Sequence, residues 1–431
     1  MSLCGLDFGT SNSTIGVLRD GRKLMVPLDG DGRSALQTIM PSAMFFDFED
    51  DQLSFGRKAV ELYTQGNRGR LLRSMKSLLG GALMSDGTQF KRQFYTYDEI
   101  IGLFVGHLKR QADLFIEGTG EALQSVVMGR PVFFNDKDSA LDREAENHLG
   151  QIARLAGFKE VSFQFEPIAA ALDYEERIRS ETLALIIDIG GGTSDFTLVR
   201  LSPQRHQQVD RKADFLAHHG THVGGTDFDR DLSLATVMPE FGLGIPYRDR
   251  PSLLMPSHFY FKLATWHEID LLYERECEFA LKDLRLLLSD KQPVDRLLAL
   301  LKARQGHQLA ACVEQAKIEL SSRRKTTVDL PALFTDWSDV VINHCELTRQ
   351  SLQDSVAAQV ARIFTAMDET LTQAGVTRAQ VNTIFTTGGS TALPMIQQRV
   401  QDSFPEAEHV GGDLYNSVGR GLLVEAVKRY S

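Results

Sequence analysis

Short apolar runs alternate with longer amphipathic stretches through the first half of the chain. Residues 3–8 and 14–18 have the length and apolar content of buried strands. Residues 98–115 repeat apolar side chains every three or four positions, which predicts a helix with one apolar face. That face consists of Ile100, Ile101, Phe104, Val105 and Leu108. Strands that alternate with helices predict a mixed α/β fold.

The alternation continues to the middle of the chain and resumes near its C-terminal end. Further strands are predicted at residues 41–46, 126–129, 161–165 and 383–387, and further helices at residues 138–156, 166–174 and 416–428. Gly157 follows one of these helices, where a C-terminal stop is expected. Pro167 lies in the first turn of another, where proline is well tolerated.

Residues 239–304 have a different character, helical and charged, with prolines at positions 246, 251, 256 and 293. We interpret them as an inserted helical subdomain. The 431 residues are more than one ordinary core holds, so two or three domains are expected. A duplicated hairpin, described below, indicates two packed lobes. The predicted first lobe is residues 1–177, completed by residues 408–431. The predicted second lobe is residues 178–407 and includes the insertion.

Composition and charge exclude several classes of protein. The net charge of -10 argues against a nucleic-acid surface and against a basic membrane patch. No apolar run approaches the ~18 residues that a membrane span needs. The cysteines Cys4, Cys277, Cys312 and Cys345 are far apart and form no C-x-x-C pair. Reduced, mostly buried thiols and a cytoplasmic location are therefore expected.

Two glycine turns of matching design begin the two halves of the chain. Residues 7–13 read Asp-Phe-Gly-Thr-Ser-Asn-Ser, and residues 188–195 read Asp-Ile-Gly-Gly-Gly-Thr-Ser-Asp. Each stands between two apolar strands. Such a turn directs backbone N–H groups and hydroxyls toward one point, where a phosphate can be bound. The duplication predicts a phosphate chain held from both sides, without the G-x-x-x-x-G-K-[ST] loop, which the chain lacks.

Aspartate beside such a turn suits magnesium, which prefers carboxylates, water and substrate phosphates. Asp7, Asp188 and Asp195 are the candidate ligands, although aspartate also caps turns without binding a metal. Lys76 could stabilise charge that develops during phosphoryl transfer, and Glu166, rigid before Pro167, could orient water. The histidines at 218, 219 and 222 lack cysteine or paired carboxylates at ligand spacing, so no metal is expected there.

With these residues in view, the chain resembles the nucleotide-binding domain of the 70-kDa heat-shock chaperones, within the actin-like ATPase superfamily. The resemblance covers nearly the whole length, except the helical stretch around residues 239–304. Residues 7–13 and 188–195 resemble the two phosphate loops of the family. The resemblance implies a two-lobed fold. Each lobe would be a mixed sheet with flanking helices, similar to RNase H.

Other segments point to the chaperone branch in particular. Residues 130–136 resemble the strand end before the first connecting helix, and residues 166–171 resemble the segment whose glutamate organises the catalytic water. Residues 388–391 with Pro394 resemble the adenosine loop. Glu314, Gln315, Ala316 and Lys317, followed by Ser321, are similar to the helix that lines the adenosine pocket.

The resemblance implies an ATPase with ATP or ADP and Mg²⁺ as cofactors. Asp7, Asp188 and Asp195 would hold Mg²⁺ largely through water. Lys76 and Glu166 would position the attacking water, with Thr193 and Asp195 beside the γ-phosphate. The implied nucleotide-binding residues are Gly9, Thr10, Ser11, Asn12, Gly190, Gly191, Gly192, Thr193, Gly224, Gly225, Glu314, Lys317, Ser321, Gly388, Gly389, Ser390 and Asp413. The small residues implied at an interlobe hinge are Ala169, Ala170, Gly419 and Gly421.

Three positions depart from the family pattern in the adenosine half of the site. Ala392 stands where the family has an arginine that stacks on adenine, and Ile318 replaces another basic residue. Thr226 replaces an acidic residue that helps to close the site. A guanidinium stack contributes on the order of 1 kcal/mol, so weaker or less adenine-selective binding is expected.

The expected function is a slow, Mg-dependent ATPase of the chaperone type that acts as a conformational switch. Only Arg429, Tyr430 and Ser431 follow the last predicted helix, so no peptide-binding domain or lid is expected. A protein client or co-chaperone would then act through a partner or through residues 239–304. Two alternatives share the fold: a small-molecule kinase of the sugar type and an actin-like filament-forming ATPase.

Overall fold

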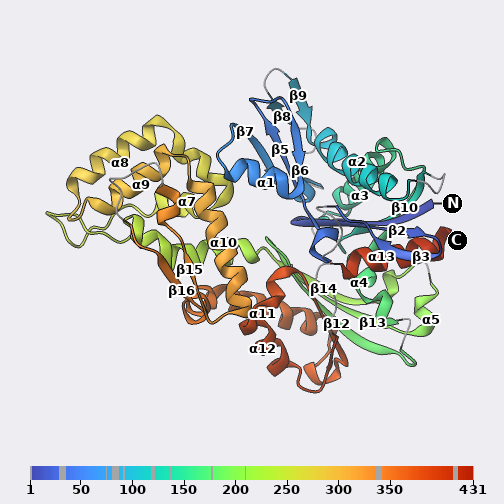
Figure 1. Cartoon of the computed structure of the whole chain (residues 1–431). Coiled ribbons are helices and arrows are strands. Elements are labelled where there is room, and N and C mark those ends of the chain that lie inside the picture. Colours follow the sequence, from blue (N-terminus) through green and yellow to red (C-terminus); the bar gives the residue numbers. More distant parts are fainter. Residues whose placement is uncertain are drawn as a thin grey trace.

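Two mixed sheets with helices packed around them form the centre of the molecule (Figure 1). The predicted mixed α/β fold is confirmed. The structure, a computed structural model, describes residues 2–28, 35–73, 75–79, 87–90, 93–117, 122–135, 138–175, 178–208, 210–334, 342–410 and 416–430.

The first sheet has the strand order β11-β10-β1-β2-β3, and β4 pairs with β2. Its strands are β1 (Ser2–Phe8), β2 (Asn12–Arg19), β3 (Arg22–Met25), β4 (Met40–Pro41), β10 (Leu123–Arg130) and β11 (Glu160–Phe165). Helices α2 (Tyr97–Phe115) and α3 (Ser139–Leu155) pack on each other and on this sheet. All five residues of the predicted apolar face of α2 are buried, and Thr96 and Glu99 form a capping box at its start.

The second sheet has the order β14-β13-β12-β17-β18. Its strands are β12 (Thr182–Ile189), β13 (Ser194–Leu201), β14 (Phe215–Thr221), β17 (Thr383–Thr387) and β18 (Glu408–Val410). Its helices include α5 (Pro203–His206), α6 (Gly225–Leu232), α11 (Arg349–Ala374) and α12 (Pro394–Ser403). Both sheets contain one shared unit, because the hairpins β1–β2 and β12–β13 are antiparallel and their first strands each pair with a parallel neighbour, β10 and β17.

The remaining elements of the first half form a smaller layer beside the first sheet (Figure 1). Strands β6, β5 and β7 form one small sheet, and β8 pairs with β9. These elements are η1 (Ala35–Thr38), β5 (Ala43–Asp47), β6 (Leu53–Phe55), α1 (Gly56–Thr64), β7 (Gly69–Arg73), the 3-10 helix η2 (Met75–Leu78), β8 (Gly87–Phe90) and β9 (Gln93–Thr96).

Helices α4 (Glu166–Glu175) and α13 (Ser417–Tyr430) cross between the two sheets (Figure 1). Their contact depends on small residues, because a Cβ on Gly421 would overlap the carbonyl group of Ala169. A Cβ on Gly5 of β1 would likewise overlap the backbone of Leu423. The expected close approach of the crossing helices is therefore present, and their role as a hinge stays a prediction.

Residues 239–304 are helical, as the sequence predicts, and project from the second sheet on the side away from the chain ends (Figure 1). The short helices η4 (Ser233–Val237) and η5 (Met238–Phe241) lead into this stretch. It contains α7 (His258–Leu263), η6 (Trp266–Tyr273), α8 (Arg275–Leu287) and α9 (Gln292–Lys302). It is followed by α10 (Gly306–Ser322), β15 (Lys325–Val328), η7 (Pro331–Phe334) and β16 (Cys345–Thr348). Phe241, Tyr260 and Leu297 belong to the same buried cluster as Ile187 of β12. The helical segment therefore shares its core with the second sheet.

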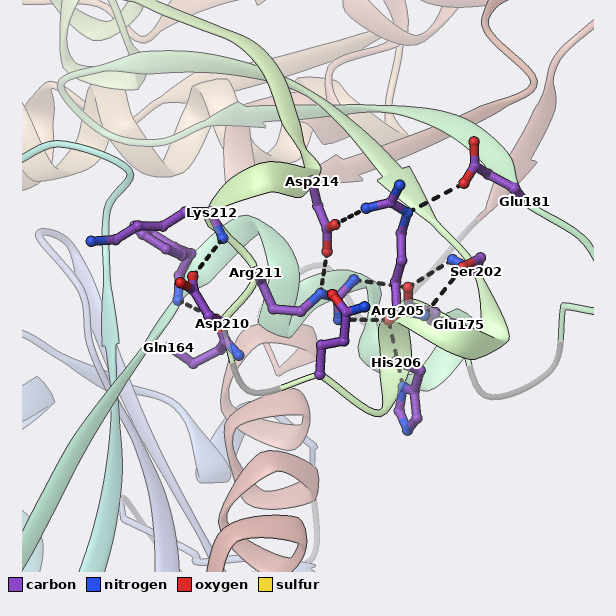
Figure 2. Close-up of polar contacts among 12 residues, drawn as sticks. Gln164, Glu175, Glu181, Ser202, Arg205, His206, Asp210, Arg211, Lys212 and Asp214 are labelled. Carbon is purple, nitrogen blue, oxygen red and sulfur yellow. Dashed lines mark hydrogen bonds and ion pairs between the residues drawn. The ribbon is translucent and has the colours of Figure 1, made fainter.

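A buried cluster of charges joins the end of α4 to the connection between β13 and β14 (Figure 2). Arg211, 1% exposed, donates to both carboxylate oxygens of Glu175 at 2.9 and 2.8 Å. Its Nε also donates to Asp214, which in turn accepts from Arg205. The backbone N–H of Ser202 completes the shell of Glu175 at 2.8 Å. Each buried charge therefore has an opposite partner.

The end of the chain divides between the two sheets. Strand β18 pairs with β17 and extends the second sheet, although the predicted boundary of the second lobe lies at residue 407. Helix α13 packs on β1 and β10 of the first sheet. The assignment of the two lobes as domains stays a prediction.

The expectation that the cysteine thiols are mostly buried is wrong. All four lie in described segments and none forms a disulfide, but only Cys4 is buried, and Cys277, Cys312 and Cys345 are half-buried. Burial raises the pKa of the Cys4 thiol, which keeps it protonated and inert. Across the part of the chain that the structure describes, no helix has the length and apolar character needed to cross a membrane.

Removing Arg211 tests the importance of the buried cluster. Arg211→Ala leaves Glu175 and Asp214 without their shared partner, and we expect the free energy of unfolding to fall by about 3 kcal/mol or more. Urea unfolding followed by circular dichroism measures the loss. The control is Arg200→Ala, an exposed arginine 4.0 Å from Glu181, which should change stability by less than about 0.5 kcal/mol. Equal stability of the two variants would show that the cluster contributes nothing.

Candidate nucleotide site

The first glycine turn closes the β1–β2 hairpin and is braced from outside. Asp7, near the end of β1, pairs in register with Thr14. A Cβ on Gly9 would overlap the carbonyl oxygen of Asn12, so the turn is tight enough to require glycine. Ser42 donates its N–H to the Ser11 carbonyl at 2.9 Å and its hydroxyl to the Gly9 carbonyl at 2.6 Å. Residues 10–12 remain partly exposed on this rigid turn.

The second glycine turn closes the β12–β13 hairpin in the same way. Asp188 and Asp195 lie opposite each other in the register of the two strands. The N–H of Gly190 donates to the Thr193 carbonyl at 2.9 Å, and the Thr193 hydroxyl donates to Asp195 Oδ2 at 3.0 Å. Gly192 and Thr193 are exposed, so their N–H groups are accessible to an anion.

The two turns meet. A Cβ on Gly191 would overlap the hydroxyl oxygen of Ser11, which places the second turn directly against the first. The sequence separates these residues by 180 positions, so only the tertiary fold brings them together. A phosphate chain between them can be bound from both sides.

Lys76 and Glu166 form an ion pair beside this meeting point. Lys76 lies in η2 and Glu166 is the first residue of α4; their side chains are 8% and 19% exposed. Burial lowers the pKa of Lys76, but the attraction of Glu166, Asp7 and Asp188 outweighs it and raises the pKa above its usual value. Lys76 is therefore charged at neutral pH, and the pair is held in place.

The three aspartates carry more negative charge than their surroundings neutralise. Burial, with repulsion from Glu166, raises the pKa of Asp7 to about 7. Burial and the neighbouring Asp195 and Glu166 raise the pKa of Asp188 to about 7. Burial raises the pKa of Asp195 to about 6, although the Thr193 hydrogen bond opposes this. A cation placed among these carboxylates would remove the repulsion, which fits the predicted magnesium site.

The arrangement of the side chains in this site determines how it would hold a metal ion. Over the described ranges, no group of three or more His, Cys, Asp or Glu side chains is arranged to ligate one ion directly. Magnesium keeps several of its waters in proteins, so contact through water fits this donor set. In the histidine cluster, His218 instead contacts Thr197 Oγ1 through Nδ1 at 2.9 Å, and His219 pairs with Glu369 at 2.9 Å.

A third loop packs on the second glycine turn. The N–H of Gly225 donates to the Gly190 carbonyl at 2.9 Å, and the N–H and hydroxyl of Thr226 donate to the Gly191 carbonyl at 2.7 and 2.8 Å. Thr226 therefore ties the start of α6 to the second glycine turn. A Cβ on Gly224 would overlap Gly191, which requires glycine in this loop.

The predicted adenosine loop reaches the same turn from β17. Ser390 donates its hydroxyl to the Gly190 carbonyl at 3.2 Å. Gly388 has a φ of 82°, and a Cβ there would overlap the Ile189 carbonyl and Asp188. Gly389 is exposed at the start of the following turn. The structure thus brings all of these predicted residues together.

Helix α10 supplies the other predicted adenosine residues. Lys317 is buried and binds Asp229 Oδ2 at 2.8 Å and the Gly225 carbonyl at 3.1 Å. Glu314 is half-buried, and the Ser321 hydroxyl donates to the Ile318 carbonyl at 2.6 Å. Ile318 itself is 52% exposed. Asp413 and Asp136 lie outside the described residues.

Asp229 is a residue of this site that the sequence analysis missed. Burial raises its pKa to about 6, while Lys317 lowers it. Its second oxygen, Oδ1, is buried without a hydrogen-bond partner. Asp229 is the last residue of the segment Gly-Gly-Thr-Asp-Phe-Asp at the start of α6. Nothing in the sequence indicates that its partner is Lys317, 88 residues later.

A small cavity lies between the two sheets behind the carboxylates. Its volume of about 40 Å³ is enough for a few water molecules. It is lined by Pro131, Val132, Glu166, Pro167, Ile186, Asp188, Asp195, Thr197, His218, Thr387 and Val418. The cavity therefore adjoins Glu166 and both aspartates of the second hairpin.

The chain matches a known protein family over most of its length. The family model described as Hsp70 protein matches residues 3–242 and 295–425. The chain belongs to the Hsp70 family. Residues 243–294, which this family model does not match, lie within the helical segment of this Hsp70 chain.

Curated relatives of this Hsp70 chain carry the name Chaperone protein DnaK. The protein from Methanothermobacter thermautotrophicus is 26% identical over 98% of this chain and 59% of its own length. Those from Thermus thermophilus and Thermoplasma volcanium are 25% and 26% identical over 98% of this chain, and 60% and 57% of their own lengths. The chain therefore spans somewhat less than two thirds of the length of these relatives.

Removing the charge of Asp188 tests whether this charge destabilises the folded protein in the absence of ligand. The raised pKa of Asp188 means that its charge destabilises the folded state, and this penalty grows from about pH 4 to about pH 7. We expect Asp188→Asn to raise the Tm by about 2–5 °C at pH 8 in EDTA, and by much less at pH 4. Scanning calorimetry at both pH values measures the shift.

The control for this substitution is Asp50→Asn, which changes an exposed carboxylate in the turn after β5. It should leave the Tm unchanged at both pH values. If Asp188→Asn lowered the Tm at pH 8, the carboxylate would be stabilised by its surroundings and the proposed charge excess would be wrong.

Proposed function

We propose that this Hsp70 chain binds ATP with magnesium and hydrolyses it slowly, as a conformational switch of the chaperone type. The observation that carries the proposal is the contact between the two glycine turns, with three crowded carboxylates and the Lys76–Glu166 pair beside it. Family membership supports nucleotide binding and a chaperone role.

The phosphates would lie between the two turns. Thr10, Ser11 and Asn12 offer hydroxyl, amide and N–H donors from the first turn, and the backbone at Gly191, Gly192 and Thr193 offers N–H donors from the second. The proximity of Ser11 to Gly191 sets the spacing of these two donor groups. Both turns are tightened by glycine and hydrogen bonds, so little reorganisation is needed on binding.

Asp7, Asp188 and Asp195 would hold Mg²⁺ through water molecules. The ion would neutralise part of the negative charge of the phosphates. Glu166 would accept a hydrogen bond from the attacking water and orient it, and Lys76 would hold Glu166 in position. Lys76 would also attract the charge that develops on the transferred phosphoryl group, with Thr193 beside it.

Glu314, Lys317, Ser321 and the 388–390 loop would surround the ribose and the base. Lys317 is already engaged by Asp229, so its position is defined before the nucleotide binds. Ile318 and Ala392 would offer apolar contact where the family has basic side chains. We therefore propose modest selectivity for adenine.

The switch would operate at the crossing helices α4 and α13, where the glycine contacts permit close packing. Rotation of the two sheets about this contact would change the surface of the molecule. A protein client or a co-chaperone would recognise that change, and the helical segment at residues 239–304 is one candidate surface.

Substitution of Lys76 tests the catalytic assignment. Lys76→Ala removes the charge that positions Glu166 and stabilises the phosphoryl group, and we expect single-turnover hydrolysis to slow about 100-fold or more. The Kd for ATP should change by less than about threefold, because the phosphates are held mainly by the two turns. Lys282→Ala, an exposed lysine on α8, is the control. Unchanged hydrolysis in Lys76→Ala would refute the role of Lys76.

Magnesium dependence tests the carboxylate assignment. Calorimetric titration with ATP, with and without Mg²⁺, should show tighter binding with the metal in the unsubstituted chain. Asp188→Asn should lose most of this difference, because it removes one of the three charges that hold the hydrated ion. Titration with GTP in parallel measures base selectivity. A full magnesium effect in Asp188→Asn would place the ion elsewhere.

A further inference from the structure

The last residue of β10 is a buried arginine that binds two carboxylates of α3. Arg130 is 8% exposed. Its Nη2 donates to both carboxylate oxygens of Asp142 at 3.0 and 2.9 Å, and its Nη1 donates to Glu146. Charge-assisted hydrogen bonds to two carboxylates fix the orientation of the planar guanidinium. The end of β10 is therefore held against α3.

The same guanidinium fixes the chain that follows β10. Its Nε donates to the Pro131 carbonyl at 3.0 Å, and its Nη2 donates to the Val132 carbonyl at 3.3 Å. Asp142 also accepts the N–H of Phe134 at 2.7 Å. Residues 131–134 are therefore tied to α3 by the ion pair between Arg130 and Asp142.

Arg130 also contacts the strand that leads into Glu166. It lies opposite Phe165 in the register of β10 and β11, and its guanidinium is 5.2 Å from the centre of the Phe165 ring. A second ring, that of Phe134, has its centre 5.3 Å away. Cation–π contacts of this kind are stronger where the cation is shielded from water. Because Phe165 directly precedes Glu166, the arginine also fixes the point where α4 begins.

The side chain of Glu166 packs on β10 one residue before Arg130. A Cβ added to Gly129 would lie 3.1 Å from Cγ and 3.4 Å from Oε1 of Glu166. The backbone of Glu166 thus continues from the end of β11, while its side chain contacts the end of β10. A shift of either strand end would move the carboxylate.

The ion pair with Lys76 does not by itself define where the carboxylate lies. Lys76 binds Glu166 through an ammonium group on a flexible side chain, so it can follow a displaced carboxylate. Arg130 differs, because each of its three guanidinium nitrogens donates to a partner in α3 or in the backbone after β10. The fixed reference for Glu166 is therefore on the Arg130 side.

We propose that Arg130 is a positioning residue for Glu166. By tying the ends of β10 and β11 to α3, it holds the carboxylate where it would orient the attacking water. The proposal rests on the proposed function, which gives Glu166 that task. Within the described part of the chain, the polar partners of Arg130 are Asp142, Glu146 and two backbone carbonyls, none of them in the phosphate turns. Arg130 should therefore govern the rate of hydrolysis and leave nucleotide affinity nearly unchanged.

Single-turnover hydrolysis and equilibrium binding test this role in the full chain. We expect Arg130→Met to slow hydrolysis of Mg·ATP about tenfold, because Glu166 is no longer held in one position, and to change the Kd for ATP less than twofold. Arg143→Met, which replaces an exposed arginine next to Asp142 on α3, is the matched control and should change neither quantity. An unchanged hydrolysis rate, or a Kd that rises as much as the rate falls, would overturn the proposal.

A milder variant tests the same contacts if Arg130→Met does not fold. Asp142→Asn keeps the shape of the side chain and leaves Glu146 as a charged partner of Arg130. We expect it to slow hydrolysis about threefold, again with the Kd for ATP changed less than twofold. Hydrolysis at the rate of the unsubstituted chain would contradict the positioning role.

Hydrogen exchange reports on the backbone around Glu166 without nucleotide. In ligand-free protein, Arg130→Met should accelerate amide exchange at least threefold in peptides that cover residues 163–170, and Arg143→Met should not. Equal exchange in the two variants would show that Arg130 does not hold Glu166. Faster exchange in Arg130→Met, together with no ATP hydrolysis by the unsubstituted chain, would support the hold on Glu166 and refute the proposed function.

Discussion

The structure depends on the meeting of two acidic glycine turns. Each turn alone is an ordinary hairpin end, but Ser11 and Gly191 come into contact and bring Asp7, Asp188 and Asp195 into one electrostatic environment. Burial and repulsion from Glu166 raise the pKa values of all three carboxylates, and the ammonium group of Lys76 does not offset them. The fold therefore holds an excess of negative charge where a hydrated cation and a phosphate chain would complete the site.

That charge is tolerated because the surrounding framework is tightly packed. Helices α4 and α13 cross with almost no side chain between them at Gly421 and Ala169. At the far end of α4, Glu175 is fixed by Arg211 and its partners (Figure 2). Glu166 begins the same ten-residue helix, so one rigid element carries a site carboxylate at its first residue and a buried ion pair at its last. Motion between the sheets would therefore be transmitted along α4.

The helical segment adds a contact that the paired hairpins do not require. Its core is continuous with that of the second sheet, yet Trp266 and Asp270 face the first half of the chain and contact Arg73 and Tyr63. The binding site and this distant contact share helix α10, which carries Lys317 as well as His307. Residues of the segment that the family model does not match thus contact α1 and β7 of the first half of the chain.

The sequence by itself determined the local elements and the type of chemistry. Apolar periodicity located α2, and the glycine turns with their aspartates indicated phosphate and magnesium, because these features depend on neighbouring residues. Tertiary structure alone decided which distant groups meet: Glu175 with Arg211, Asp229 with Lys317, and Tyr63 with His307. Such pairs leave no periodic pattern, and neither partner differs in sequence from an ordinary surface charge or aromatic residue. Their partnership arises only when the sheets and crossing helices pack, since burial is what gives each contact its strength.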